Sequence, residues 1–597
     1  MELGNLPRWD LSDLYSGPDA ADLAADLEKA DAAAKKFNGD FAGKVGSLSA
    51  AGLAHAIQRY ERDEDLLGRI SSYAQLYHAA DVADREVGRF YQTTMERLSE
   101  ITSKLIFFTL ELNRIEDAAL EALLAADPAL AHYAPWLRDV RAARPHQLAD
   151  EQEQLLHEKQ VTGRAAWNRL FDETMADMRF AVDGPGSGSG ADEELSLEQT
   201  LHLLSETDGA QRKAAAKALG AGFEKHKSLF ALITNTLAKD KEIEDKWRKF
   251  ARPDSSRHLS NLVEDEVVDA LADAVIAAYP RLSHRYYALK AKWFGVDALD
   301  YWDRNAPLPD EDQQTISFQA ARDQVLDAYG RFSPVLRDVG QRFFDNDWID
   351  APSVPGKSGG AFAHPTVPSA HPYLLLNYQG RSRDVMTLAH ELGHGVHQVL
   401  AAGQGALMAD TPLTLAETAS VFGEQLTFRA MLDRETDPTR RKAMLAGKTE
   451  DMLNTVVRQI AFYDFERRLH NERRGGELSV ERIGEIWMAV QGGSLGPAIR
   501  LHPEYANYWL YIPHFVHSPF YVYAYAFGDC LVNSLYAVYQ DAHVGFAEKY
   551  LDMLRAGGSL RHRELLAPFG LDAADPDFWQ QGLGVIERFI DELEELS

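Results

Sequence analysis

Three histidines and one glutamate lie within eight residues of one predicted helix, at His390, Glu391, His394 and His397. Residues four apart share one face of a helix, so the imidazoles of His390 and His394 can bind the same metal ion. Glu391 lies off that axis and can reach a water on the ion without being a ligand, as in the H-E-x-x-H arrangement. The pattern predicts half of a metal site; the alternative is a His-rich helix face exposed to solvent.

A third protein ligand is expected in the next helix, because catalytic zinc sites have three protein ligands and leave the fourth position to water. The segment "TPLTLAETASVFGEQL" predicts a helix that begins with Thr411 as the N-cap and Pro412 in its first turn. Glu417 follows among small and apolar residues, where a carboxylate needs a partner. Glu424 is seven residues further on, and it either orients a ligating histidine or is a surface carboxylate.

Two further residues of the metal helix predict contacts rather than ligation. His397 completes the row of histidines but lies another turn along the helix, so we expect an orienting or packing role for it. Gly393 costs about 1 kcal/mol in a helix relative to alanine. Its presence predicts that another part of the chain, such as a helix, closely approaches the backbone there.

The elements that must position these residues read as helices over most of the chain. Apolar residues recur at helical spacing, among other places, at 49–82, 84–114, 196–248, 383–402, 412–433, 436–471 and 520–556. Residues 350–380 are rich in Gly and Pro, and "YLLLNY" (373–378) predicts a strand. The fold class is therefore mostly α, with a small β element beside the metal helix.

The stretch "GPGSGSGADEE" is the clearest break in the chain. It predicts an N-terminal helical domain at 1–183, a linker at 184–194 and a catalytic helical domain at 195–597.

Composition excludes several classes of partner. The net charge of −29 disfavours nucleic acid and anionic membranes. Cys530 is the only cysteine, which suits the cytoplasm, and we expect no secretory signal at the N-terminus. Residues 505–528 contain no Asp, Glu, Lys or Arg. Their histidines, prolines and tyrosines nevertheless predict a buried, polar-lined interior rather than a membrane span.

At "NYQGRSRDVMTLAHELGHGVH" and "TPLTLAETASVFGE" the sequence resembles the M3 family of zinc metallopeptidases, and more closely its oligoendopeptidase F branch. "WDLSDLY" and "HFVHSPFYVYAYAFG" fit the same branch, and the resemblance runs over nearly the whole chain. It implies a two-lobed, multi-helical peptidase with one zinc ion deep in a substrate channel. It also implies that His390, His394 and Glu417 are the ligands, that Glu391 is the base, and that short unstructured oligopeptides are the substrates.

Peptide hydrolysis by such a site uses a zinc-bound water that Glu391 deprotonates, and the same carboxyl then protonates the departing nitrogen. The oxyanion needs further donors. In this family they come from the segment that corresponds to 514–525, where we favour His514 and Tyr521, with Tyr525 as an alternative. The glycine-rich segment 356–362 is a candidate for pairing with the substrate backbone; otherwise it is a mobile loop.

Three alternatives remain at this point. A zinc-dependent carboxypeptidase on a similar helical fold would need a basic anchor for the peptide C-terminus, and no motif assigns one. A peptide-binding protein without activity would be marked by the loss of Glu391 or of a ligand, and neither is lost. A helical scaffold with a chance motif would bind no stoichiometric zinc. The sequence does not indicate an oligomeric state.

Overall fold

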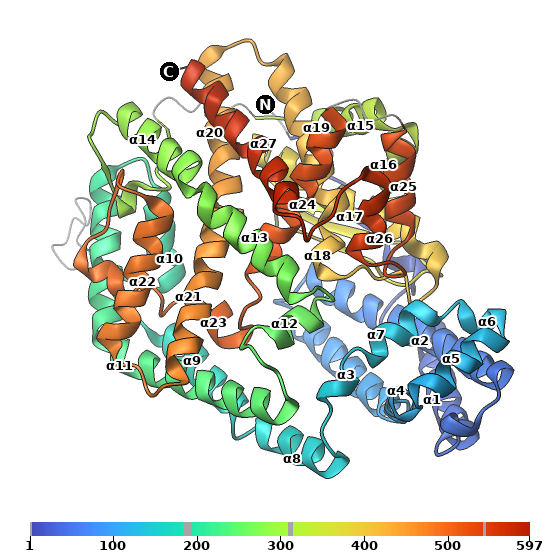
Figure 1. Cartoon of the computed structure of the whole chain (residues 1–597). Helices are drawn as coiled ribbons and strands as arrows, with labels where there is room; N and C mark the ends of the chain where they lie inside the picture. Colours follow the sequence, from blue (N-terminus) through green and yellow to red (C-terminus); the bar gives the residue numbers. More distant parts are fainter. Residues whose placement is uncertain (1–2, 183–192, 309–314, 541–544, 597) are drawn as a thin grey trace. The chain divides into compact units, whose positions relative to one another are not determined.

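The computed structural model describes residues 3–182, 193–308, 315–540 and 545–596, and helices dominate them (Figure 1). This confirms the mostly α fold class. The chain forms two compact units: unit 1 is Met1–Arg144, Gln313–Arg434 and Val538–Leu571, and unit 2 is Pro145–Asp312, Glu435–Ala537 and Asp572–Ser597. The predicted domain boundary at 184–194 remains a prediction, and its residues 184–192 lie outside the described part of the chain.

Unit 1 contains the predicted metal helix and a three-stranded sheet. Its helices are α1 (Ala21–Phe41), α2 (Ala50–Ala80), α3 (Arg85–Thr102), α4 (Ile106–Arg114), α5 (Asp117–Ala126), α6 (Pro128–Ala131), α7 (Ala134–Arg141), α15 (Phe318–Phe332), α16 (Pro334–Asp345), α17 (Ser382–Ala401), α18 (Leu413–Ala416), α19 (Thr418–Arg434), α25 (Phe546–Arg555) and α26 (His562–Leu566). Its strands are β4 (Ile349–Pro352), β5 (Phe362–His364) and β6 (Tyr373–Tyr378).

The sheet has the order β4-β6-β5, and β6 has the bounds predicted from the sequence. β4 runs parallel to β6, with Ile349 opposite Leu374, and β5 runs antiparallel to it. A Cβ atom added at Gly395 of α17 would lie 3.3 Å from Leu374 Cδ2, so this face of the sheet packs against the metal helix. The predicted β element therefore lies beside α17.

Helices α17 and α19 are in backbone contact (Figure 1). A Cβ atom at Gly393 would lie 2.5 Å from the carbonyl oxygen of Ala419 and 2.6 Å from Cα of Ser420. Real Cβ atoms do not approach backbone atoms so closely. The prediction of a close approach at Gly393 is confirmed, and the approaching element is the helix that follows Glu417.

Unit 2 is also helical and has two two-stranded sheets. Its helices are α8 (Asp150–Gln160), α9 (Arg164–Asp177), α10 (Leu197–His202), α11 (Gly209–Arg248), α12 (Ser255–Ser260), α13 (Asp265–Ala278), α14 (Ser283–Trp293), α20 (Pro438–Thr455), α21 (Val457–Arg473), α22 (Val480–Leu495), α23 (His514–His517), most of α24 (Tyr523–Gln540) and α27 (Pro576–Glu595). Its strands are β1 (Phe180–Val182), β2 (Glu193–Leu195), β3 (Leu299–Asp300) and β7 (Ile499–Arg500).

The uncharged segment 505–528 is largely buried in unit 2 and forms parts of α23 and α24. Tyr523 of this segment is fully buried, and its hydroxyl accepts a hydrogen bond from Asn261 Nδ2 at 2.8 Å. This agrees with the prediction of a polar-lined interior. Within the described ranges, no helix combines the length and the apolar character needed to cross a bilayer.

Several predicted helices are interrupted in the structure. The segment 84–114 divides into α3 and α4 around Ser103, whose hydroxyl donates back to the carbonyl of Glu100. The segment 412–433 breaks at Glu417. Its predicted N-cap, Thr411, is wrong by one residue: Pro412 is the N-cap, and Thr411 Oγ1 lies 3.4 Å from His397 Nε2. Helical spacing persists across breaks of one to three residues, so periodicity does not reveal them.

Candidate metal centre

The metal helix α17 presents His390 and His394 on one side while its apolar residues enter the core. Val385, Leu388, Leu392 and Val396 are buried, as the spacing of an amphipathic helix requires. The helix start is fixed by Asp384, whose Oδ2 accepts the backbone N–H groups of Gln379 and Arg381, both at 2.9 Å. The side chains of His390 and His394 remain 28% and 19% exposed, so both imidazoles are open on one side.

Glu417 lies at the break between α18 and α19. Helix α18 ends with Glu417 as its C-cap. The carbonyl oxygen of Glu417 accepts a backbone hydrogen bond from the N–H of Val421, in the first turn of α19, at 3.1 Å. The hydroxyl of Ser420 donates to Glu417 Oε2 at 2.7 Å and so holds the carboxylate toward α17. The contact of Ser420 with Gly393 then sets the distance between this carboxylate and the two histidines.

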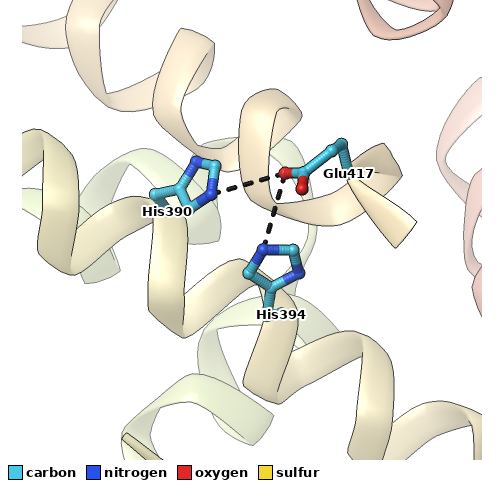
Figure 2. A group of neighbouring side chains, drawn as sticks. All are labelled: His390, His394 and Glu417. Atoms are coloured by element: carbon cyan, nitrogen blue, oxygen red, sulfur yellow. Dashed lines mark ion pairs between the residues drawn. The ribbon is translucent and has the colours of Figure 1, made fainter. Parts of the chain in front are cut away.

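The three predicted ligands converge (Figure 2). Glu417 Oε2 lies 3.4 Å from His390 Nε2 and 3.5 Å from His394 Nε2. Two ligand atoms about 2.0–2.1 Å from a tetrahedral zinc ion lie roughly 3.3 Å apart, so Glu417 Oε2 has nearly the required spacing from each imidazole. All three donor atoms lie within 4.8 Å of one another. The donor set of two imidazoles and one carboxylate suits a catalytic divalent ion that keeps an open position.

Both imidazoles have further hydrogen-bond partners. His390 Nδ1 lies 3.3 Å from Glu424 Oε2, and His394 makes a hydrogen bond with the backbone of Ala416. Such partners fix the ring orientation and the tautomer of a metal-binding histidine. The structure therefore places Glu424 where it can orient His390, rather than on the surface.

The electrostatics of this group favour a positive charge. Burial by itself would lower the pKa of His390, but the carboxylates of Glu424, Glu417 and Glu391 outweigh it and raise this pKa to about 9. Burial lowers the pKa of His394 to about 4. The carboxylates therefore favour a cation beside the imidazoles, and a divalent ion would provide it while both rings stay neutral.

Glu391 lies beside the predicted ligands and is almost fully buried, with 7% of its surface exposed. Burial raises the pKa of its carboxyl to about 7, although His390 and a backbone hydrogen bond from Ala363 of β5 oppose the rise. A carboxyl in this position can both accept and release a proton.

His397 is separate from the group. It is buried, its burial lowers its pKa to about 4, and its Nε2 faces Thr411. In the described part of the chain, the side chains close enough to share a metal ion are those of His390, His394 and Glu417. The packing role predicted for His397 fits this position.

The predicted oxyanion donors form a second cluster, within unit 2. His514 Nε2 lies 3.3 Å from the Tyr525 hydroxyl, and the His514 ring is stacked at 6.0 Å from the ring of Tyr521. His517 instead contacts Asp172 at 2.8 Å, and Tyr523 is turned into the core. The structure thus brings His514, Tyr521 and Tyr525 together and separates the other two polar side chains from them.

Two contributors to the centre were not predicted. Ser420 holds Glu417, and the buried Tyr329 hydroxyl donates to the carbonyl of Ala389 in α17 at 2.6 Å. Ser420 was not found, because its bond to Glu417 depends on the helix break at Glu417, which periodicity does not reveal. No sequence signal reveals Tyr329, which comes from α15.

Comparison with known proteins places the chain in a family. The model of peptidase family M3 matches residues 202–585, and the oligopeptidase F model matches residues 111–180. Oligopeptidase PepF of Bacillus subtilis is 24% identical, over 98% of this chain and 87% of its own length.

Solved structures share the fold. A putative peptidase from Chlamydophila abortus superimposes with a TM-score of 0.86 at 22% identity, over 100% of this chain and 99% of that one. Oligoendopeptidase-F from Enterococcus faecium superimposes with a TM-score of 0.71 at 23% identity, over 96% of this chain and 97% of that one. The chain belongs to peptidase family M3, in its oligoendopeptidase F branch, and by that membership it is a metal-dependent endopeptidase of the oligopeptidase type.

Proposed function

We propose that the protein is a zinc-dependent endopeptidase that hydrolyses internal bonds of short, unstructured oligopeptides. The observation that carries the proposal is the convergence of His390, His394 and Glu417 beside the buried carboxyl of Glu391. One zinc ion per chain is held by these three side chains. When bound, the ion supplies Lewis-acid chemistry, because it acidifies water and polarises the carbonyl of the peptide bond.

The chain's own residues then handle the protons and the substrate. A carboxylate oxygen of Glu391 accepts a proton from the attacking water, and the same carboxyl passes it to the departing peptide nitrogen. His514 and Tyr521, with Tyr525 as the alternative, donate hydrogen bonds to the oxyanion.

The substrate backbone pairs with the free edge of β5. The structure puts the glycine-rich residues 356–361 in a loop immediately before β5. Lys357 anchors this loop, since its buried ammonium donates to the carbonyl oxygens of Asp350 and Pro352 at 3.0 and 2.8 Å. An anchored edge strand suits the addition of an extended peptide.

Oligopeptides as substrates follow from membership of the peptidase family. The net charge of −29 disfavours nucleic acid as a partner, and the single, buried Cys530 suits the cytoplasm. Burial raises the pKa of the Cys530 thiol well above its usual value, so a catalytic role for that thiol is not proposed.

Digestion of a mixed peptide library, with mass analysis of the products, tests the proposal. We expect internal cuts in short peptides, including peptides blocked at both ends, and loss of all cuts with a chelator. Cleavage confined to free C-termini would favour the carboxypeptidase alternative. Cleavage that survives complete metal removal would reject the metal mechanism.

Glu391→Gln tests the base. The amide cannot take up the proton, and general-base catalysis typically contributes about 10²–10⁴-fold, so we expect a fall in kcat of that size. Zinc content should stay at one per chain, since the three ligands are unchanged. A variant that cleaves at near the wild-type rate would show that another group is the base.

A further inference from the structure

A cavity of about 390 Å³ lies in unit 1 between helix α2, helix α3 and strand β5. Its volume is within the range of roughly 300–1,000 Å³ that is typical of ligand pockets. It is lined by Gln75, Leu76, His78, Ala79, Tyr91, Phe362, Ala363 and His364. The proposed mechanism uses none of the five residues from α2 and α3.

The cavity is next to the proposed reaction centre through β5. Ala363, which lines it, makes the backbone hydrogen bond to the base Glu391. β5 pairs with β6 along one edge, and no described strand pairs with its other edge. A peptide that adds to that edge would therefore pass both Glu391 and the mouth of the cavity.

Strand geometry separates the two faces. Ala363 is opposite Leu374, whose side chain faces α17, so the Ala363 side chain also faces α17. Phe362 and His364, one step away in the strand, point to the other face. The side chains of an added peptide would also alternate between the two faces of the sheet. Those on the face opposite α17 would enter the cavity.

The lining selects the kind of side chain. The rings of His78 and Tyr91 are stacked at 4.7 Å, and Phe362 supplies another ring. Among the described residues that line the cavity, none is an Asp, Glu, Lys or Arg, so a charged guest would lose water without an ionic partner. Stacked or edge-on aromatic contacts stabilise an aromatic guest beyond its buried area.

One polar atom at the cavity lacks a partner. His364 Nε2 is buried and has no hydrogen bond to any residue that the structure describes. A buried ring nitrogen without a partner costs stability.

We propose that this cavity is a specificity pocket that binds a large aromatic side chain of the peptide substrate, close to the bond that is cut. The inference rests on the proposed peptidase function and deepens it. His78, Tyr91 and Phe362 would contact the ring.

The test uses the full-length enzyme and one blocked peptide in which each position around the mapped cut is varied in turn to Phe, Tyr, Leu, Ala, Lys or Asp. We expect one position at which kcat/KM for Phe exceeds that for Ala by about tenfold or more. Gln75→Glu should raise the Lys-to-Phe ratio at that position alone, by about fivefold or more, because it places a carboxylate in the pocket.

The matched control is Gln58→Glu, which makes the same change on α2. It is 17 residues earlier and roughly 25 Å away along the helix axis, so the Lys-to-Phe ratio should not change. Thermal unfolding of each variant confirms folding, and ratios between peptides cancel differences in active enzyme.

The two levels of the proposal fail differently. If no peptide is cut in a chelator-sensitive way, the proposed function itself is rejected. If peptides are cut but no position prefers an aromatic residue, the pocket is not a specificity site. The same conclusion follows if Gln75→Glu changes the ratio no more than Gln58→Glu does.

Discussion

The metal helix and the tyrosine-bearing segment 514–525 both carry the polar side chains of the proposed site, but different kinds of contact fix the positions of those side chains. His390 and His394 are one turn apart in α17, and Gly393 between them brings α19 into backbone contact. In 514–525, three tyrosines alternate with apolar residues across a loop and a helix start, and they point in different directions. The first group is fixed by helix geometry, and the second by packing around each residue.

Removal of one predicted metal ligand should have the largest effect on the metal site. Glu417→Ala takes away the only carboxylate among the three predicted ligands, and we expect loss of bound zinc on dialysis together with loss of peptide cleavage. Metal analysis after dialysis checks the result. Asp433→Ala, an exposed carboxylate of α19, should retain its zinc. Unchanged zinc content in Glu417→Ala would remove Glu417 from the site.

Single hydroxyl deletions test the second group. Tyr521→Phe should lower kcat by about 10²–10³-fold, the effect of losing one oxyanion donor. Tyr525→Phe should have the smaller effect if Tyr521 is the donor, and the reverse order would assign the role to Tyr525. Zinc content should be normal in both variants.

Tyr523→Phe is the internal control for this pair. Its hydroxyl is buried against Asn261, so the substitution should lower the stability by about 1 kcal/mol and leave kcat close to wild type. Equal activity losses in all three variants would mean that the segment acts through packing rather than through a donated hydrogen bond.

Glu424→Gln tests whether the carboxylate of Glu424 orients the predicted metal ligand His390. The amide keeps the shape of Glu424 but loses its charge beside His390 Nδ1, 3.3 Å away. Loss of such a partner typically costs about 10–100-fold in metal affinity or activity, so zinc should bind more weakly in a competition with a chelator. Asp433→Asn is the matched neutralisation on the same helix, and the two variants should differ by at least tenfold.

Features that depend on nearby residues could be predicted from the sequence, whereas features that depend on distant segments could not. The spacing of His390 and His394, the strand at 373–378 and the close approach at Gly393 depend on neighbours in the chain or on one residue's size, and all three are found in the structure. The break at Glu417 and the direction in which Tyr523 points depend on contacts between distant segments. Periodicity carries no information on such contacts, so these features and the lining of the α2–α3 cavity required the fold.

The last prediction concerns Gly393, and it tests what fixes the positions of His390, His394 and Glu417. Gly393→Ala places a methyl group where Ala419 O and Ser420 Cα already lie, 2.5 and 2.6 Å from the new carbon. The two helices must separate, which typically costs about 1–3 kcal/mol, more than the roughly 1 kcal/mol gained in helix propensity. The midpoint of thermal unfolding should fall, and zinc should bind more weakly because Ser420 holds Glu417.

Gly88→Ala in α3 should change the midpoint of thermal unfolding in the opposite direction. No atom lies within 4 Å of a Cβ added at Gly88, so only the helix propensity changes and the midpoint should rise or stay constant. If Gly393→Ala behaves like Gly88→Ala and binds zinc normally, the contact between α17 and α19 does not set the position of Glu417. The metal group would then depend, like the tyrosine segment, on packing elsewhere.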